Sequence, residues 1–154
     1  MGADNQTFYI QGELIETGST PGFEFASYRH GPHVLHRIKV VGPIGLKERI
    51  PLYHKTLALT PDDTYFCILD NSERHNNSFS FEDIRFLDQM LLDAGIATFY
   101  GATITLDAGY RDIVELANAN VENVGLNGKL MTTHSPEEAE TFIMEMLAST
   151  DGGK

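Results

Sequence analysis

The chain carries a group of histidines whose side chains could bind a metal ion. His30, His33 and His36 fall in one short stretch, and a zinc site needs three or four converging nitrogen, sulfur or oxygen ligands. His30 and His33 could approach each other across the Gly31-Pro32 turn between them. In a strand, His33 and His36 point to opposite faces because their separation is odd. The spacing therefore disfavours a three-histidine site. It leaves His30 and His33 as weak metal candidates and favours ordinary core or turn histidines.

A second group of chemically capable residues follows the apolar run Thr64–Leu69. Asp70 stands at the end of this run, where α/β folds commonly place ligands or catalytic groups. Asn71, Ser72 and His75 follow in the next few positions. The residue types of a Ser-His-Asp catalytic set are therefore present in this segment. The sequence lacks both the Gly-x-Ser-x-Gly motif of a nucleophile elbow and a glycine-rich phosphate loop. A small hydrolytic enzyme is therefore the least favoured interpretation.

Two serines, Ser78 and Ser80, precede a predicted helix. A phosphate at a helix N-terminus meets exposed N–H groups and the positive end of the helix dipole, so phosphorylation there is physically sensible. The competing interpretation is that Ser80 caps the helix, with Asp83 at the third helical position. Capping is favoured because capping serines are common, and the phosphorylation switch stays open.

Periodicity predicts the elements that position these residues. A β-hairpin is predicted over Phe23–His30 and Val34–Val41, because alternate residues of the second arm are apolar and indicate one buried face. The run Thr64–Leu69 is apolar on both faces, as in a strand at the centre of a sheet that helices cover on both sides. Further strands are predicted within Thr7–Glu16, Ile96–Leu106 and Lys129–Thr133.

Four helices are predicted from apolar residues at helical spacing. Their stripes are Leu46, Ile50, Tyr53 and Leu57; Phe81, Ile84, Leu87 and Leu91; Ile113, Leu116 and Ala117; and Ala139, Phe142, Ile143, Met146 and Leu147. Pro51 lies within the first stripe, so that helix starts or kinks near it. Gly95 closes the second helix. The last helix begins with Ser135 as N-cap, Pro136 at the first position and Glu138 completing a capping box.

Composition limits the class of protein. The chain has 154 residues, of which 42% are hydrophobic and 21% charged, as expected for one compact domain. Its formal net charge of −11 disfavours binding to nucleic acid or anionic membrane, since both need clustered Lys and Arg. The single cysteine, Cys67, leaves no partner for an intrachain disulfide and indicates a reducing compartment. With no signal peptide and no apolar run of membrane-spanning length, a cytoplasmic location without membrane insertion is expected.

A hairpin followed by alternating helices and strands, over about this length, resembles the STAS (sulfate transporter and anti-sigma-factor antagonist) superfamily. In that family an apolar strand ends in an acidic or polar residue and a loop carries a serine to the next helix, as in Tyr65–Asp70 followed by Ser78 or Ser80. Ser135–Ala139 before a short last helix is also similar to the family's end. The family's phosphorylated serine sits in an Asp-Ser-Ser-Gly-Leu-like stretch, whereas this chain has Asn77–Phe81, with no glycine after the serine.

The resemblance covers roughly residues 23–148, and divergent, stand-alone bacterial members of the superfamily match at least as well. It implies an α/β fold with a mixed sheet of about five strands, an N-terminal hairpin and about four helices. We expect a single STAS-like domain over residues 1–154, with a core of about 23–148 and flexible ends at 1–6 and 149–154.

For function, we expect a non-catalytic regulatory or protein-interaction module that needs no cofactor. Its interaction or phosphorylation candidates are Asp70, Asn71, Ser72, Ser78 and Ser80, and its partner is another protein or a second copy of itself. A carrier of a small apolar, lipid-like ligand is the alternative, since related folds include lipid carriers.

Overall fold

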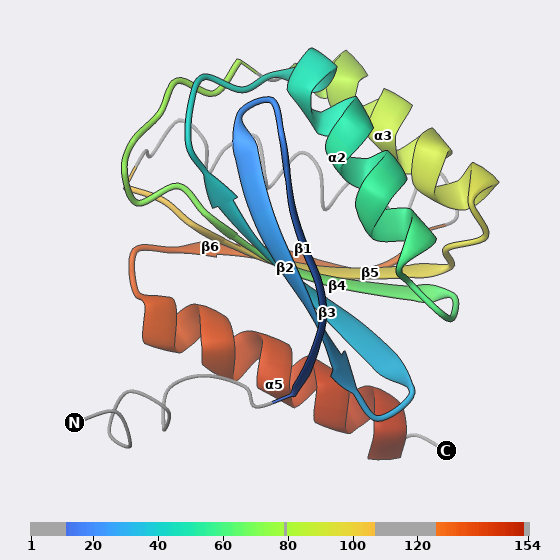
Figure 1. Ribbon diagram of the computed structural model, residues 1–154. Helices are drawn as coiled ribbons and strands as arrows, with labels where there is room; N and C mark the ends of the chain where they lie inside the picture. Colours follow the sequence, from blue (N-terminus) through green and yellow to red (C-terminus); the bar gives the residue numbers. More distant parts are fainter. Residues whose placement is uncertain (1–11, 79, 107–125, 153–154) are drawn as a thin grey trace.

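The computed structural model describes residues 12–78, 80–106 and 126–152. The predicted helix at Ile113, Leu116 and Ala117 lies outside these residues. In the described part, helices cover both faces of one mixed β-sheet (Figure 1).

Six strands form the sheet, in the order β1-β2-β3-β4-β5-β6. Their bounds are β1 Glu13–Thr20, β2 Phe23–His30, β3 His33–Val40, β4 Thr64–Asp70, β5 Thr98–Ile104 and β6 Asn127–Thr133. The first three strands pair antiparallel, and β3 to β6 pair parallel. The predicted order of a leading hairpin and later parallel strands is therefore confirmed.

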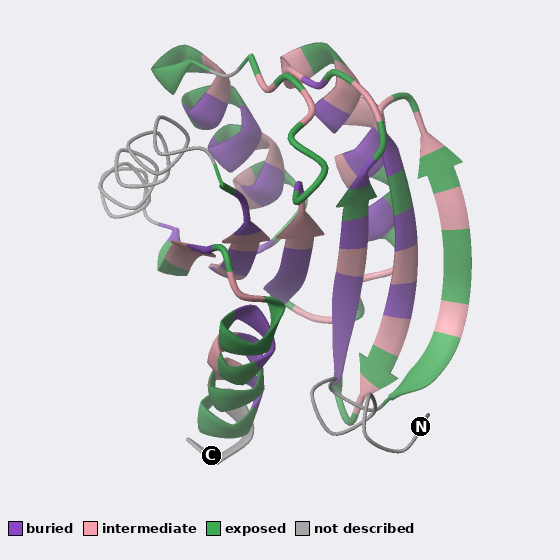
Figure 2. Ribbon diagram, turned by 90° about the vertical axis from the view of Figure 1, so that its left-hand side faces the viewer, coloured by how far each residue is buried: buried purple, intermediate pink, exposed green. Residues whose placement is uncertain are grey.

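The sheet has six strands rather than the expected number of about five, and β1 lies further along the chain than the strand predicted within Thr7–Glu16. The apolar residues of Thr7–Glu16 suggested an early strand, but β1 starts at Glu13 and runs to Thr20. It is an edge strand whose residues are mostly exposed (Figure 2), so it lacks the apolar alternation that reveals a strand. Pro21 and Gly22 turn the chain into β2, and Gly22 has a φ of +83° that suits glycine.

The strand β4 is central, as predicted from its apolar run. It pairs with β3 on one side and β5 on the other, and its residues from Thr64 to Ile68 are all buried. Alternate side chains face two separate hydrophobic cores. Tyr65 and Cys67 belong to one core, and Phe66 and Ile68 belong to the other.

Three described helices enclose these cores. They are α2 Leu46–Ala58, α3 Phe81–Asp93 and α5 Pro136–Gly152. Helices α2 and α3 lie side by side on one face of the sheet, and α5 lies on the other (Figure 1). The core under α5 includes Leu35, Phe66, Ala139 and Ile143, all of which are fully or almost fully buried.

The helix α2 differs from its predicted form. It begins at Leu46, well before Pro51, which lies inside it. Its buried residues are Arg49, Leu52 and Thr56, one position away from the predicted apolar stripe. Thr56 can be buried because its hydroxyl donates to the Leu52 carbonyl oxygen (3.0 Å) and accepts from the Tyr65 hydroxyl (2.8 Å), which satisfies both polar groups.

The ends of α3 agree with prediction, and the start of α5 agrees in part. Gly95 follows α3 with a φ of +88°, the left-handed conformation of a helix C′ glycine. At α5 the Ser135 hydroxyl accepts from the Glu138 N–H (3.2 Å). The predicted capping box does not form, because the Ser135 N–H donates to the Thr133 hydroxyl (3.0 Å) and the Glu138 carboxylate accepts from that same hydroxyl.

Candidate interaction surface

The site candidates from Asp70 to Ser80 lie at the carboxyl edge of the parallel strands. This segment, the Asp70–Ser80 loop, leaves the end of β4 and enters the first turn of α3. Within it Ser72, Glu73, Arg74, Asn76 and Ser78 are exposed. The loop therefore presents a row of polar and charged side chains to solvent at the sheet edge where α/β folds bind ligands.

Asn71 organises the first half of the loop from a buried position. Its N–H donates to the Ile104 carbonyl oxygen (2.8 Å), which ties the loop to β5. Its side-chain amide donates to the His75 carbonyl oxygen (3.1 Å) and accepts from the His75 N–H (3.0 Å). The reciprocal bonds close a tight turn in which Arg74 adopts a φ of +63°. Asn71 is thus a structural residue of the loop.

Charged side chains link the loop to β3. Lys39 and Glu73 form an ion pair of 3.1 Å, and Glu73 also accepts from His75 Nε2 at 3.2 Å. The hydrogen bond from Lys39, and then that from His75, lowers the pKa of Glu73, while the same carboxylate raises the pKa of Lys39. Asp70 accepts from the Ser72 N–H at 2.9 Å. These contacts fix the direction of the exposed side chains near the end of β4.

The second half of the loop is joined to the segment that precedes α2. Ile44 donates its N–H to the Asn76 carbonyl oxygen (2.9 Å) and accepts from the Ser78 N–H (2.9 Å). Arg49 is buried and donates to the Asn77 side-chain oxygen (3.0 Å) and the Gly45 carbonyl oxygen (3.3 Å). The Arg49 guanidinium therefore joins the Asp70–Ser80 loop to the segment that precedes α2.

The two serines have different surroundings. Ser80 is the N-cap of α3 in a complete capping box: its hydroxyl accepts from the Asp83 N–H (3.1 Å), and the Asp83 carboxylate accepts from the Ser80 N–H (3.0 Å). The predicted capping role is thus confirmed. Ser78 is exposed, and its N–H is bonded to Ile44.

The candidate histidines lie far from this loop, at the opposite edge of the sheet. His30 and His33 are register partners across the hairpin turn. His33 Nδ1 bonds the Asp62 carboxylate at 2.7 Å. Burial, and next the charge of Arg37, lower the pKa of His30. No group of three or more His, Cys, Asp or Glu side chains able to hold a metal ion occurs among the described residues.

His36 lies on the other face of the hairpin, as the strand period predicted. Its Nδ1 is 2.7 Å from the Ser27 hydroxyl, and its Nε2 is 2.9 Å from the Thr60 hydroxyl. Thr60 donates to the Thr56 carbonyl oxygen, so it accepts from His36 Nε2–H, and Ser27 donates to Nδ1. Burial lowers the pKa of His36 to about 3. This imidazole is a neutral core group.

Asp70 and His75, which the sequence suggested as members of a Ser-His-Asp set, have other hydrogen-bond partners. Asp70 bonds the Ser72 N–H, and the His75 ring bonds Glu73. Cys67 is buried in β4, and burial raises the pKa of its thiol to about 12. The thiolate, which is the nucleophilic form, is therefore strongly disfavoured at neutral pH.

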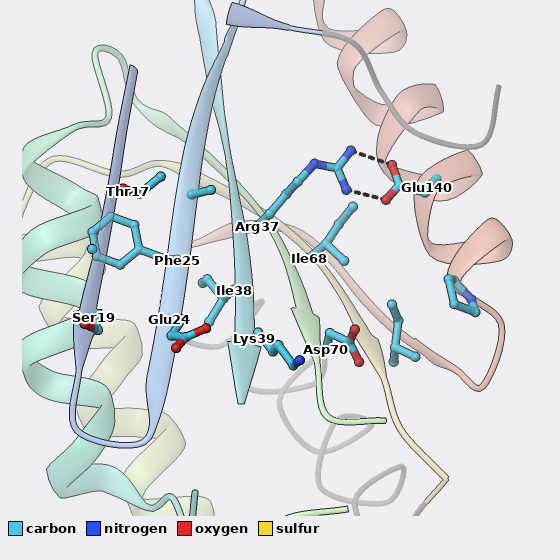
Figure 3. A pocket seen from close by; sticks show the side chains of 14 residues that line it. Thr17, Ser19, Glu24, Phe25, Arg37, Ile38, Lys39, Ile68, Asp70 and Glu140 are labelled. Atoms are coloured by element: carbon cyan, nitrogen blue, oxygen red, sulfur yellow. Dashed lines mark hydrogen bonds and ion pairs between the residues drawn. The ribbon is translucent and has the colours of Figure 1, made fainter. Parts of the chain in front are cut away.

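An open groove of about 630 Å³ lies beside the loop, on the face of the sheet that α5 covers only in part (Figure 3). Lys39 and Asp70 line one part of it. Further along, Arg37 on β3 reaches α5 and makes a two-pronged ion pair with the Glu140 carboxylate, one contact of which is 2.7 Å. The groove is therefore lined by charges of both signs.

Sequence reasoning missed three contributors to this surface: Arg49, Lys39 and Glu140. A signal existed for Arg49, which stands at helical spacing with Leu52 and Thr56. Lys39 alternates with the apolar residues of its strand, but its partner could not be found without the register that places it beside Asp70. Glu140 meets Arg37 across a separation of 103 residues, which no local pattern reports.

Comparison with known proteins identifies the fold. No protein-family profile matches the chain, and no curated protein matches it. Among solved structures it resembles an uncharacterised protein of the DUF3478 family, with a SpoIIAA-like fold, from Shewanella loihica PV-4. The identity is 13%, the match covers 84% of this chain and 98% of that chain, and the TM-score is 0.52. At this identity the likeness shows the fold alone.

The chain therefore has a SpoIIAA-like fold, the STAS-like architecture that its sequence resembles. The sheet with its leading hairpin and flanking helices agrees with that class. Within the described residues, no helix combines the length and apolar character needed to cross a membrane.

Proposed function

We propose that this protein is a non-catalytic, cytoplasmic interaction module that binds a partner protein through the Asp70–Ser80 loop and the first turn of α3. The observation that carries the proposal is the construction of the loop. Its backbone is held by the bonds of Asn71, Ile44 and Arg49, while its outer side chains stay exposed. A surface fixed in advance loses little conformational entropy on binding, which favours recognition.

Charge suggests the chemistry of the partner. The loop and the first turn of α3 carry the acidic residues Asp70, Glu73, Glu82 and Asp83. The basic residues there are fewer: Arg74 in the loop, and Lys39, which reaches Glu73 from β3. Opposite charge across an interface speeds association and selects the partner. The proposed partner is therefore a protein with a basic patch, and binding should weaken as salt rises.

The test compares variants at exposed charged residues, and circular dichroism checks that each variant is folded, because Glu73→Lys also removes the ion pair with Lys39. Tagged wild-type protein captures partners from the lysate of its source organism, alongside Glu73→Lys and a matched control, Glu145→Lys, on the exposed side of α5. The proposal expects the wild-type and control proteins to capture one partner protein that Glu73→Lys does not capture. In a binding assay with purified proteins, Glu73→Lys should bind that partner at least tenfold more weakly than wild type. Equal affinity for all three proteins would refute the loop as the binding surface.

For the regulatory part of the proposal, Ser78 is the better phosphorylation candidate. The Ser80 hydroxyl is occupied by its cap, and a phosphate there would face the Asp83 carboxylate. Ser78 is exposed and lies outside that cap. The expected result is that Ser78→Asp changes partner affinity with little change in melting temperature. If Ser78→Asp leaves partner binding unchanged, the proposed phosphorylation switch is refuted, while the proposed binding module stands.

The apolar-ligand carrier has less support. The groove beside α5 is lined by Arg37, Lys39 and Asp70, and burying charges against a lipid chain is costly. Native mass spectrometry of freshly purified protein separates the two functions. The bare chain mass favours the interaction module, and a retained lipid-sized mass favours the carrier.

A further inference from the structure

Val41 and Leu106 are large apolar residues that stay exposed beside the Asp70–Ser80 loop. Val41 directly follows β3 and is 40% exposed, and Leu106 comes two residues after the end of β5 and is 49% exposed. The strand β4 lies between β3 and β5, and all three strands run parallel. The two residues therefore stand on either side of the point where the loop leaves β4. Single exposed apolar residues are ordinary, but a group of them is typical of a protein-interaction site.

The backbone fixes these positions before any partner binds. The Val41 N–H donates to the Gly22 carbonyl oxygen (2.9 Å), which extends the pairing of β2 with β3 by one residue. Between the two apolar residues, the Asn71 N–H donates to the Ile104 carbonyl oxygen (2.8 Å). Neighbouring strands lie about 5 Å apart, so β3 and β5 are separated by roughly 10 Å. This spacing accommodates one apolar side chain between Val41 and Leu106.

Next to this apolar pair, negative charge is in excess. The strand register places Glu24 beside Lys39 and Lys39 beside Asp70, and Glu73 forms an ion pair of 3.1 Å with Lys39. Figure 3 shows Glu24, Lys39 and Asp70 at one end of the groove that they line. Among the described residues of this cluster, one ammonium group faces three carboxylates, so a cationic group of a partner would be attracted here.

We infer that the groove end, which consists of Glu24, Lys39, Asp70, Val41 and Leu106, binds a peptide segment of the partner in which a large apolar side chain neighbours a lysine or an arginine. The inference deepens the proposed function and rests on it. The apolar side chain packs between Val41 and Leu106, which removes apolar surface from water. The neighbouring cation pairs with the carboxylates of Glu24 and Asp70.

Both halves of the groove end select this occupant. A lipid chain could contact the apolar pair, but it brings no cation to the carboxylates, which its approach would deprive of water. A nucleic acid brings negative charge to a surface where carboxylates are in excess. A cationic segment without an apolar side chain would leave Val41 and Leu106 exposed. A segment that carries both groups satisfies the whole surface.

The first experiment selects binders from a library of random peptides displayed on phage, with the full chain immobilised. The inference expects the selected peptides to share a large apolar residue next to Lys or Arg. Selected sequences that are acidic, or that lack this pairing, would overturn the inference. A failure to select any peptide would overturn it as well.

The second experiment measures the affinity of one selected peptide, synthesised with a fluorescent label, by fluorescence anisotropy. Val41→Ser and Leu106→Ser should each raise the dissociation constant at least tenfold, because each removes an apolar contact at the centre of the site. The matched control Met144→Ser, which removes an apolar side chain of α5 that is 46% exposed, should bind like wild type. Circular dichroism checks that each variant is folded. Equal affinity of Val41→Ser, Leu106→Ser and wild type would overturn the inference.

Glu24→Gln tests the charge of the bound segment. Glu24 is exposed, so this variant removes a carboxylate without leaving a buried group unpaired. It should weaken peptide binding at low salt and have little effect at high salt, where the lost attraction is already screened. Peptide binding that responds neither to salt nor to Glu24→Gln would overturn the cationic part of the inference.

The captured partner protein separates this inference from the proposed function. If Glu73→Lys loses the partner while Val41→Ser and Leu106→Ser bind it like wild type, the loop remains the binding surface and the groove end is refuted. If all three variants bind the partner like wild type, the proposed function fails as well.

Discussion

Arg37 on β3 and Glu140 on α5 join the sheet to the only described helix on that face through two parallel hydrogen bonds. The Glu140 side chain is 4% exposed and that of Arg37 is 20% exposed. The carboxylate is therefore the member whose loss of hydration must be compensated, and the guanidinium supplies that compensation at the edge of the groove.

Removing only the arginine should leave the Glu140 carboxylate buried without its guanidinium partner. Arg37→Met is expected to lower the free energy of unfolding by about 3 kcal/mol. The double variant Arg37→Met, Glu140→Leu should recover to within about 1 kcal/mol of wild type, because a well-packed apolar pair often replaces a buried ion pair without loss. Urea denaturation measures both, and a double variant as unstable as the single one would contradict this account.

The Ser80 cap has a predictable stability effect. Ser80→Ala should lower the free energy of unfolding by about 1 kcal/mol, since the Asp83 N–H loses its acceptor. Ser78→Ala serves as the matched control and should change stability by less than about 0.5 kcal/mol. Chemical denaturation of the two variants is the measurement. Equal losses would mean that the cap contributes nothing specific.

His36 should make stability depend on pH. Its pKa of about 3 in the folded chain lies below the ordinary histidine value of 6.5, so between these values the unfolded chain binds the proton more tightly than the folded chain. Stability contributed by neutral His36 is thus fully present above pH 6.5 and falls as pH drops toward 3, by up to about 5 kcal/mol. His36→Gln should flatten this slope. An identical slope in the variant would show that other groups cause it.

Cys67 should be chemically silent in the folded protein. Burial and a pKa near 12 keep the thiol protonated and inaccessible. A thiol reagent at pH 8 should therefore modify it only at the rate of unfolding, and rapidly in denaturant. Fast modification of native protein would show that β4 opens readily.

Much of the fold is local in origin and could be predicted. Three features follow from residues that are close in sequence: the apolar run of β4, the cap at Ser80 and the glycine at position 95. The parts that were missed depend on distant partners. β1 is a strand because β2 pairs with it, and Arg49 is buried because the Asp70–Ser80 loop supplies Asn77 as its acceptor.

The candidate site follows the same division. The sequence located the Asp70–Ser80 loop and the capping role of Ser80, since both follow from an apolar strand and a helix start. It could not assign Asn71 to loop construction, because that role appears only when its amide meets the His75 backbone. Nor could it pair Lys39 with Glu73, which requires β3 and β4 to lie side by side.

The measurement that most directly tests the central claim is hydrogen–deuterium exchange of the protein with and without its captured partner. The interaction module predicts that binding slows exchange in peptides covering residues 70–85, with no comparable change on α5. Protection confined to α5 or to the β1–β2 hairpin, with residues 70–85 unchanged, would contradict the account.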